Sequence, residues 1–443
     1  MAILQQLLFL ASIGVAGYFI FKRVKFLRRN ILLGKPIGKV DNPSERIKQT
    51  LLIAFGQKKM FDKPFVGLMH LIIYVGFLII NIELLEIVLD GLTGRHRLFA
   101  GILGNLYPLL INFFEILALG VVFSCVIFFS RRNFIKIDRF QKPELQGFPM
   151  KDANTILIWE VVLMFCLYTM NATDSILQTR GEESEYIKSH FVPVGSFAIS
   201  SFFIPIYNNL GTNVLLVVER LAWWIHILGI MGFAVYVTYS KHLHIMLAFP
   251  QVYFANLKPK GEMENMATVT KEVKIMLGLE QPEANPAPVG TFGVKDVTDL
   301  KWTDILSAYS CTECGRCTQA CPANQTGKKL SPRKIMMDIR DRADELGNLL
   351  DSGKDINDGK SLYGSYTTKE ELMACTTCNA CAEACPLNIN PLSIILQERR
   401  YIAMEESGTP ASWNSMFQNI ENNQAPWAFS ASDRFKWGED VRN

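Results

Sequence analysis

Charged residues are scarce in this chain of 443 residues, at 20%, whereas hydrophobic residues make up 49% and the mean hydropathy is +0.16. An ordinary soluble domain has about a quarter of its residues charged, so part of this chain is expected to lie in a membrane. The net charge is only +3, which gives no reason to expect nucleic acid as a partner. The sequence also lacks a G-x-G-x-x-G fingerprint and a Walker A loop, which places hydride chemistry and ATP use elsewhere.

Five apolar runs are long enough to cross a bilayer as helices, which takes about 20 residues each. They lie near residues 3–21, 65–89, 106–129, 155–170 and 213–239. The apolar stretch from Gly195 to Tyr207 is short and contains Pro205, so it is interpreted as interfacial. The sequence therefore predicts an all-α fold with a bundle of about five transmembrane helices in residues 1–250.

Basic residues flank these spans on one side. Clusters of Lys and Arg follow the first span (22–29), precede the second (58–63) and follow the third (131–136), and only Arg95 and Arg97 oppose the pattern. Because cationic flanks stay in the cytoplasm, the N-terminus is expected outside and the long C-terminal part inside a bacterial cytoplasmic membrane. A cleaved signal peptide is the alternative for the first span, but its positive charge would precede the apolar stretch.

After Pro250 the composition becomes mixed polar and charged, with a proline-rich joint at residues 281–290. We expect a linker and peripheral helix at 251–300, a soluble domain at 301–402 and a tail at 403–443. The tail carries Trp413, Trp427 and Trp437 among polar residues and is interpreted as a segment that docks a partner.

Eight of the ten cysteines form two clusters with the same spacing, C-x2-C-x2-C-x3-C-P. The first cluster is Cys311, Cys314, Cys317 and Cys321, and the second is Cys375, Cys378, Cys381 and Cys385. Three cysteines at steps of three in a tight turn can hold three corners of a cubane, while the fourth ligates the other cluster. The spacing predicts one [4Fe-4S] cluster on Cys311, Cys314, Cys317 and Cys385, and another on Cys375, Cys378, Cys381 and Cys321.

Zinc is the alternative, because paired C-x2-C units also bind it, but a zinc site has no use for the third C-x2-C step or the C-x3-C-P ending. Disulfides are disfavoured in a reducing cytoplasm. Between the motifs, Ser331–Leu346 is expected to be a helix with Pro332 in its first turn. The domain is therefore expected to be an all-helical dicluster domain rather than a small β-sheet ferredoxin.

Only six histidines are present, and four lie on or beside the second and fifth spans: His70, His226, His242 and His244. Imidazole is the usual axial ligand of a haem b held between transmembrane helices. On one continuous helix, His226 and His244 would share a face about 27 Å apart, with His242 facing almost the opposite way. We expect a haem b between His70 and His244. His70 with His226 is the second possibility, and hydrogen-bonded structural histidines are the alternative to any haem.

Several ionisable residues fall inside the predicted spans: Glu83, Glu86, Glu115, Glu160, Glu219 and Arg220. Charged groups in a bilayer are costly, so these are expected to pair with one another or to line a wet cavity. A proton path or quinone pocket and a purely structural network both remain open.

The stretches WWIH (Trp223 to His226) and SKHLHIMLAFPQVYF (Ser240 to Phe254), followed by the twin cysteine motifs, give the chain a family resemblance. It resembles the membrane-anchored iron-sulfur oxidoreductases related to heterodisulfide reductase, in which a nitrate-reductase-gamma-like membrane domain is joined to an HdrC-like dicluster domain. One branch passes electrons between electron-transferring flavoprotein and menaquinone.

The resemblance implies a partner as well. Fused members carry downstream cysteine-rich CCG domains, and here no cysteine follows Cys385, so a separate CCG-domain subunit is expected. The related anchors use two histidines on the second span for two haems. Since only His70 is present there, one haem or none is expected.

The predicted function is electron transfer between a cytoplasmic donor, such as electron-transferring flavoprotein, and membrane quinone, through two [4Fe-4S] clusters and a haem b. No catalytic residue is assigned. Basic residues near the first motif could dock an acidic donor, and a solvated face is the alternative: Arg316, Lys328, Lys329, Arg333 and Lys334. Rival functions are the membrane anchor of a lactate or glycolate oxidase complex and a redox-sensing or metal-centre assembly protein.

Overall fold

The computed structural model describes residues 2–181, 184–191, 193–282, 290–433 and 435–442. Over this part of the chain every regular element is helical, and the only β-type pairings are the isolated bridges Lys35–Lys301 and Tyr363–Thr367. The all-α prediction is confirmed.

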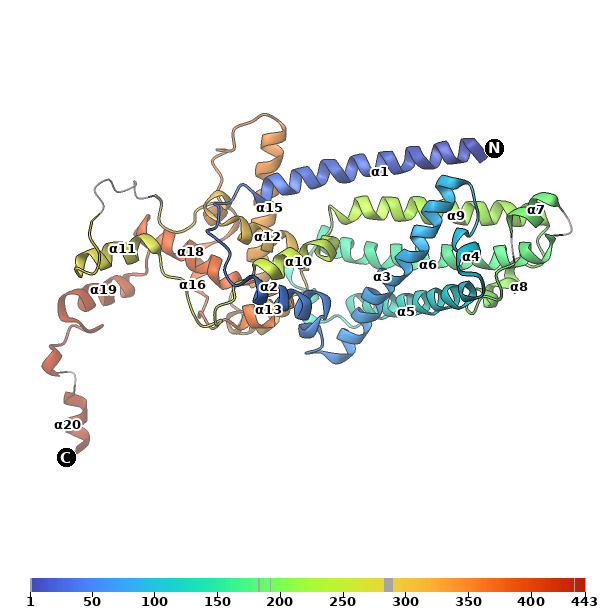
Figure 1. The fold of residues 1–443 in the computed structure, drawn as a ribbon. Coiled ribbons are helices and arrows are strands. Elements are labelled where there is room, and N and C mark those ends of the chain that lie inside the picture. The colour runs from blue at the N-terminus through green and yellow to red at the C-terminus, as the bar shows by residue number, and fades with distance from the viewer. Residues whose placement is uncertain (1, 182–183, 192, 283–289, 434, 443) are drawn as a thin grey trace.

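Five helices in the described ranges are long and apolar enough to cross a membrane, as predicted. They are α1 (Ala2–Ile31), α3 (Pro64–Thr93), α5 (Tyr107–Asn133), α6 (Phe148–Thr179) and α9 (Thr212–Val237). Helices α3, α5, α6 and α9 form a bundle, and α1 runs beside α9 and α3 (Figure 1). Each span is apolar on almost all sides, which is expected of a helix that contacts lipid as well as its neighbours.

Short elements connect the spans: α2 (Pro43–Gln49), η1 (Thr50–Phe55), η2 (Lys58–Met60), α4 (Leu98–Leu103), η3 (Gly104–Leu106), η4 (Asp138–Phe140), η5 (Pro143–Leu145), α7 (Glu185–His190), η7 (Ser200–Phe203) and α8 (Ile204–Tyr207). The apolar stretch 195–207 thus contains only η7 and the four-residue α8, too little helix to cross a bilayer.

The fifth span ends within two residues of its predicted boundary, and the chain then turns. Helix α9 ends at Val237, a turn and the 3-10 segment η8 (Lys241–Leu243) follow, and α10 (His244–Phe254) then begins. The Ser240 hydroxyl accepts a hydrogen bond from the His242 backbone N–H at 3.0 Å and caps η8. His226 and His244 are therefore not on one continuous helix, and the prediction of a shared face five turns apart is wrong.

The C-terminal domain is built from short helices around two longer ones, α15 (Pro332–Asp351) and α18 (Pro391–Met404). The others are α11 (Ala267–Met276), η9 (Val297–Asp299), α12 (Trp302–Ser310), α13 (Arg316–Ala320), α14 (Pro322–Gln325), η10 (Leu362–Tyr366), α16 (Lys369–Met373) and α17 (Ala380–Ala384). Helix α15 begins one residue after its Ser331 cap, which confirms the predicted helix. The tail elements α19 (Ala411–Asn423), η11 (Ala431–Asp433) and α20 (Lys436–Arg442) extend away from the domain (Figure 1).

The two parts of the molecule share one packed junction. The buried core of the C-terminal domain includes Leu27 from the end of α1 and Ile53 from η1. Asn30, fully buried, donates a hydrogen bond to Tyr309 on α12 at 3.1 Å. A Cβ added at Gly347 of α15 would lie 2.3 Å from the Asn30 side chain, so glycine is required for this approach. Helix α1 is therefore continuous from the membrane bundle into the soluble domain, which fixes the position of the cysteine motifs relative to the spans.

Candidate iron-sulfur and haem sites

The two cysteine motifs adopt the same backbone conformation. The second residue after each leading cysteine, Glu313 or Thr377, has a positive φ of 53° or 56°. The fourth, Gly315 or Asn379, has a φ of 70° or 60° and caps the short helix that carries the third cysteine, α13 or α17. These left-handed residues turn the chain around a common centre, which is the geometry that the spacing predicts.

The fourth cysteine of each motif crosses to the other one. Cys311, Cys314, Cys317 and Cys385 line one small cavity together with Met336 and Ile389, and we name this group site I. The thiols of Cys375, Cys378, Cys381 and Cys321 interact electrostatically with one another, and we name this group site II. Helices α13 and α17 pack against each other, so the two sites are adjacent. The structure thus brings together the same two sets of four that the crossover reasoning predicted.

The grouping of the sulfurs bears on the zinc alternative. Within the described residues, no three His, Cys, Asp or Glu side chains lie close enough together to hold a single metal ion. At site I the four cysteines surround a cavity instead. Sulfurs arranged around a cavity suit a cubane, which takes one thiolate at each corner, better than one tetrahedral ion.

Burial controls the chemistry of these thiols. Burial raises the pKa of Cys311 to about 12 and that of Cys385 to about 11, and neighbouring thiols add to both shifts. Backbone N–H groups of Leu387 and Ile389 point at the Cys385 sulfur, and the Thr377 N–H lies 3.4 Å from the Cys375 sulfur. Iron must therefore displace protons on binding, and the amides are placed to stabilise the resulting thiolate charge.

A buried arginine packs against the motif loop of site I. Arg333 is fully buried, and it forms an ion pair with Glu144 at 2.7 Å and donates a hydrogen bond to the Arg139 carbonyl at 2.8 Å. Both partners belong to the connection between α5 and α6. A Cβ at Gly315 would lie 2.4 Å from the Arg333 guanidinium, so the glycine is required by packing as well as by its φ.

A buried ion network joins site I to the end of the fifth span. Glu313 pairs with Lys241 at 2.5 Å and with Arg340 of α15 at 2.7 Å, and Lys241 also lies 3.9 Å from Asp152 of α6. Burial raises the pKa of Glu313, but these cations lower it further, so that the pKa lies below its usual range. The motif loop of site I is thus fixed to the turn between α9 and α10 by a desolvated ion pair, whose loss would leave an uncompensated charge.

Site II has a more open environment. Cys378 is exposed, whereas every other cysteine of the two sites is buried or half-buried. Arg399 of α18 donates hydrogen bonds to the Leu372 carbonyl at 2.9 Å and to the Cys375 carbonyl at 2.6 Å, which fixes the start of the second motif. Site II therefore faces solution, while site I faces the membrane bundle.

The predicted basic docking patch is wrong for three of its five members. Arg333 is fully buried, and Arg316 is nearly so and donates to the Lys59 carbonyl at 2.9 Å. Lys334 is half-buried and forms ion pairs with Asp338 and Glu371. Only Lys328 and Lys329 remain exposed. The other three side chains bind carboxylates or backbone carbonyls in the interior, where an unpaired polar group would be costly.

Two of the predicted haem ligands meet. The His70 and His244 rings have centroids 6.5 Å apart. The Nδ1–H of His70 donates to the Gln57 side-chain oxygen at 3.0 Å, and the Nδ1–H of His244 donates to the Lys241 carbonyl at 3.1 Å. In a neutral imidazole this leaves Nε2 as the nitrogen that can bind a metal, with Nδ1 held by an acceptor as in most metal-binding histidines.

The other two histidines lie in different surroundings from each other. The His242 ring lies edge-on to His244 with centroids 5.3 Å apart, so the prediction that it faces the opposite way is wrong. The 3-10 turn is the reason, because its residues do not follow the α-helical period. His226 is buried within the bundle, where it donates from Nδ1 to the Leu163 carbonyl on α6 at 2.9 Å.

The acidic residues inside the spans mostly have partners. Glu86 accepts from the Tyr107 hydroxyl at 2.8 Å, and Glu115 accepts from Asn171 at 3.1 Å and from the Ser200 backbone. Glu83 is the exception among the buried ones, since neither carboxylate oxygen has a hydrogen-bond partner in the described structure. The prediction that these residues pair with one another is confirmed for Glu219 and Arg220, which form an ion pair, whereas Glu86 and Glu115 bind neutral partners instead.

Sequence reasoning misses several buried polar residues. In the sequence Arg97 opposes the charge pattern as part of a short loop, but in the structure it is buried and pairs with Asp174 at 2.6 Å. Arg97 is an internal counter-ion of Asp174 and does not face water beside the membrane. This explains why it departs from the charge pattern of the other basic residues. Gln57 and Glu313 are also missed, although a charged residue between two cluster cysteines is a signal that could have been weighed.

Comparison with known proteins agrees with this geometry. Residues 310–389, which contain all eight motif cysteines, match the 4Fe-4S dicluster domain family. The chain is 27% identical to a probable iron-sulfur-binding oxidoreductase, FadF, of Bacillus subtilis, and 25% identical to the EtfAB:quinone oxidoreductase of Syntrophomonas wolfei. These alignments cover 99% and 98% of this chain.

A more local similarity concerns the cysteine domain. Over 23% of this chain and 49% of the relative, the sequence is 33% identical to an HdrC-type component of the ferredoxin:CoB-CoM heterodisulfide reductase of Methanosarcina mazei. The chain spans about three fifths of the length of its two long relatives, at 61% and 59%. No solved structure matches the chain.

Proposed function

We propose that the chain carries electrons between a soluble donor and a quinone in the membrane, because it is similar to HdrC-like iron-sulfur oxidoreductases and to an EtfAB:quinone oxidoreductase. The observation that supports this most directly is the placement of the two cysteine sites. Site II opens to solution at Cys378, and site I is fixed to the membrane bundle through Glu313 and Lys241.

The eight cysteines fit two [4Fe-4S] clusters, with site I on Cys311, Cys314, Cys317 and Cys385 and site II on Cys375, Cys378, Cys381 and Cys321. Such clusters supply one-electron carriers whose potentials depend on charge, hydrogen bonds and burial. The chain sets these differently at the two sites. At site I, Glu313 and Arg340 bring buried charge close to the sulfurs, whereas at site II one cysteine is exposed to water.

His70 and His244 fit a haem b. An imidazole nitrogen binds a first-row metal at about 2 Å, so two rings on opposite sides of one iron would have centroids roughly 6 Å apart. The observed 6.5 Å matches, and both Nε2 atoms are free to bind. A haem here would add a one-electron carrier on the membrane side of site I. Lys241 serves both sites, since its carbonyl orients His244 while its ammonium group holds Glu313.

Electron-transferring flavoprotein is the proposed donor and menaquinone the proposed acceptor, with either direction of flow allowed. A CCG-domain iron-sulfur subunit is the proposed partner at the open side of site II, where Cys378 is exposed. We place both sites on the cytoplasmic side, because Arg28 and Arg29 at the end of α1 and Arg131 and Arg132 at the end of α5 flank that face.

The proposal is tested on anaerobically purified full-length protein. We expect about eight iron atoms per chain and a b-type band in the reduced-minus-oxidised spectrum, together with reduction of a water-soluble menaquinone analogue. His70→Ala and His244→Ala should each remove the band, whereas His226→Ala should keep it. A zinc-bearing protein without iron would contradict the cluster assignment, and a band that survives His70→Ala would contradict the haem assignment. Co-purification from solubilised membranes identifies the donor and the partner subunit.

A further inference from the structure

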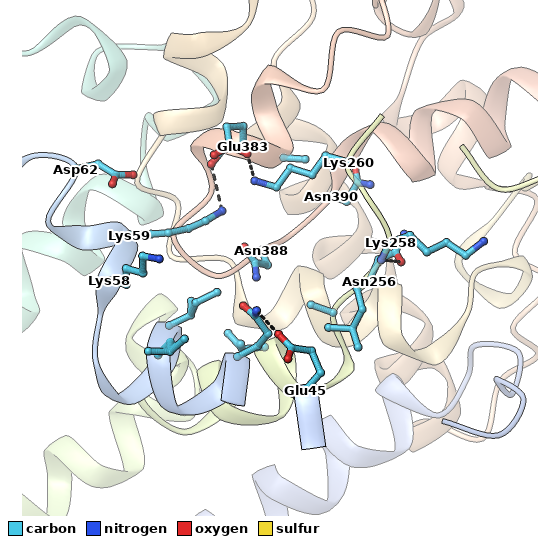
Figure 2. Close-up of a pocket in the computed structure, with 17 residues that line it drawn as sticks. Glu45, Lys58, Lys59, Asp62, Asn256, Lys258, Lys260, Glu383, Asn388 and Asn390 are labelled. Carbon is cyan, nitrogen blue, oxygen red and sulfur yellow. Dashed lines mark hydrogen bonds and ion pairs between the residues drawn. The ribbon is translucent and has the colours of Figure 1, made fainter. Parts of the chain in front are cut away.

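A cavity lies where the membrane bundle meets the cluster domain. It has a volume of about 430 Å³ and is formed by three segments that are distant in sequence. These are the α2–η2 region after the first span, the strip 255–260 that follows α10, and the stretch 382–390 around the fourth cysteine of the second motif (Figure 2).

Four lysines line this cavity: Lys58, Lys59, Lys258 and Lys260. Lys258 pairs with Glu262 at 2.8 Å, and Lys260 pairs with Glu383. Lys59 instead donates to the carbonyls of Glu383 and Cys385, each at 3.2 Å. Within the described residues neither Lys58 nor Lys59 forms an ion pair, so two positive charges at the cavity lack a carboxylate partner.

The lysines are also crowded. Lys59 and Lys260 reach the same Glu383 residue from opposite sides (Figure 2). Burial and the nearby Lys59 lower the pKa of Lys260 to about 8. A bound anion would relieve this repulsion. The side chain of Asn388 lies in the middle of the cavity between the lysines and Glu45, and its backbone has a positive φ of 56°. An amide there can donate to an oxygen anion.

One wall of the cavity is apolar and continues onto an exposed apolar surface. Leu52 of η1 lines the cavity and is 42% exposed. Its neighbours Leu51 and Phe55 are also exposed. Because η2 leads directly into the span α3, this surface lies at the edge of the bilayer. A soluble anion would make no contact with this apolar surface, whereas the acyl chains of a lipid can pack against it.

We propose that this cavity binds the headgroup of an anionic phospholipid, with the phosphate held by Lys58, Lys59 and Lys260 and the acyl chains running along η1. Basic pockets beside the cytoplasmic ends of transmembrane helices recognise anionic headgroups through this combination of charge and depth. The lipid would also brace the junction, since Lys59 simultaneously contacts the carbonyl of Cys385, a member of site I. This site is independent of the proposed electron donor and acceptor.

The test measures lipids retained by the purified full-length protein. The protein in detergent is incubated with an equimolar mixture of phosphatidylglycerol and phosphatidylcholine, and bound lipids are counted by native mass spectrometry. We expect preferential retention of phosphatidylglycerol. Each lysine near a phosphate contributes about fivefold in affinity, so Lys58→Gln with Lys59→Gln should weaken phosphatidylglycerol retention about 25-fold and leave phosphatidylcholine unchanged.

Matched controls separate the cavity from general surface charge. The double variant Lys22→Gln with Lys25→Gln removes two lysines near the C-terminal end of α1, outside the cavity. It should change retention less than twofold. Lys58→Gln alone leaves the contacts of Lys59 with the cluster loop intact, and it should still lose about fivefold if the double variant fails to fold.

Three results would overturn the proposal. The first is equal retention of the two lipids. The second is an equal loss in the cavity and control variants. The third is displacement of bound phosphatidylglycerol by excess inorganic phosphate or by the quinone analogue menadione, which would assign the cavity to a soluble anion or to quinone.

Discussion

The two cysteine motifs have the same spacing and the same backbone turns, yet their surroundings differ in almost every respect. Site I is enclosed by Arg333 and Glu313 and by two connections between helices, one from α5 to α6 and one from α9 to α10. Site II instead exposes Cys378 to solvent. The motif therefore determines the local path of the chain and the positions of the sulfurs. The residues around it decide whether a site faces the membrane or a soluble partner.

The similarity extends into the helices that follow. Each begins with a polar cap and a proline, Ser331-Pro332 or Asn390-Pro391, and the eighth residue after each proline is an arginine. Arg340 contacts the Glu313 side chain of site I, and Arg399 contacts the Cys375 carbonyl of site II. The residue before each arginine is buried, but it is Ile339 in the first repeat and Glu398 in the second. The repeat thus keeps its supporting positions and varies their chemistry.

The largest expected effect comes from the fourth cysteines, because they belong to the opposite sites. Cys385→Ser should remove the site I cluster although the residue lies in the second motif, lowering the iron content from roughly eight to roughly four. Cys321→Ser should remove the site II cluster. Iron analysis and the low-temperature electron paramagnetic resonance of the remaining cluster measure this, with Cys166→Ala in the fourth span as control. Identical remaining spectra in the two variants would contradict the crossover.

Glu313→Gln should have the next largest effect. It leaves Lys241 and Arg340 without their shared buried carboxylate, and breaking such an ion pair costs about 3–5 kcal/mol. The equivalent position of site II is Thr377, whose hydroxyl donates to the Thr376 carbonyl on the surface. Thr377→Asn should be close to neutral, since Asn tolerates a positive φ. Thermal unfolding of the solubilised protein measures both, and equal losses would show that the two surroundings are equivalent.

Gly315→Ala should destabilise the protein by about 1–3 kcal/mol, because the new Cβ meets Arg333 at a positive φ. The matching position of site II already has a side chain, Asn379, at a φ of 60°. Asn379→Gly should therefore be tolerated within about 1 kcal/mol. Unfolding midpoints and cluster retention on storage provide the measurement. A Gly315→Ala protein as stable as the parent would mean that Arg333 moves freely.

The smallest effect concerns pH and the buried Glu398, which has no counterpart in the first repeat. Burial raises the pKa of Glu398 to about 8 from an ordinary value of 4.5, despite a hydrogen bond from Thr367 at 2.6 Å. The folded state therefore holds this proton more tightly than the unfolded chain, so its contribution to stability is lost as the pH rises from about 4.5 to about 8.

Glu398→Gln removes that dependence. The stability of the variant relative to the parent should rise by about 1 kcal/mol between pH 6 and pH 7, with little further change above pH 8. Unfolding midpoints over this pH range measure it. Ile339→Val, a conservative change at the matching position of the first repeat, should show no such pH dependence.

Much of the fold and of the cysteine sites followed from the sequence. The five spans were identified because a helix in lipid must be apolar over its length, and the two groups of four cysteines because the spacing leaves few ways to surround a cubane. Where the chain changed from α-helix to a 3-10 turn, sequence reasoning failed. The capped turn after Val237 brings His242 beside His244, a result that a constant helical period could not predict.

By itself, the sequence determined the helical class, the membrane spans and the identity of the sulfur ligands, because hydrophobic length and cysteine spacing are local properties that hold wherever the segment is placed. Only the tertiary structure decided which site lies against the membrane and which basic residues are buried as counter-ions. It also decided how a lysine cavity forms from three distant segments. These are properties of contacts between residues far apart in the chain, and such contacts are fixed only when the helices have packed.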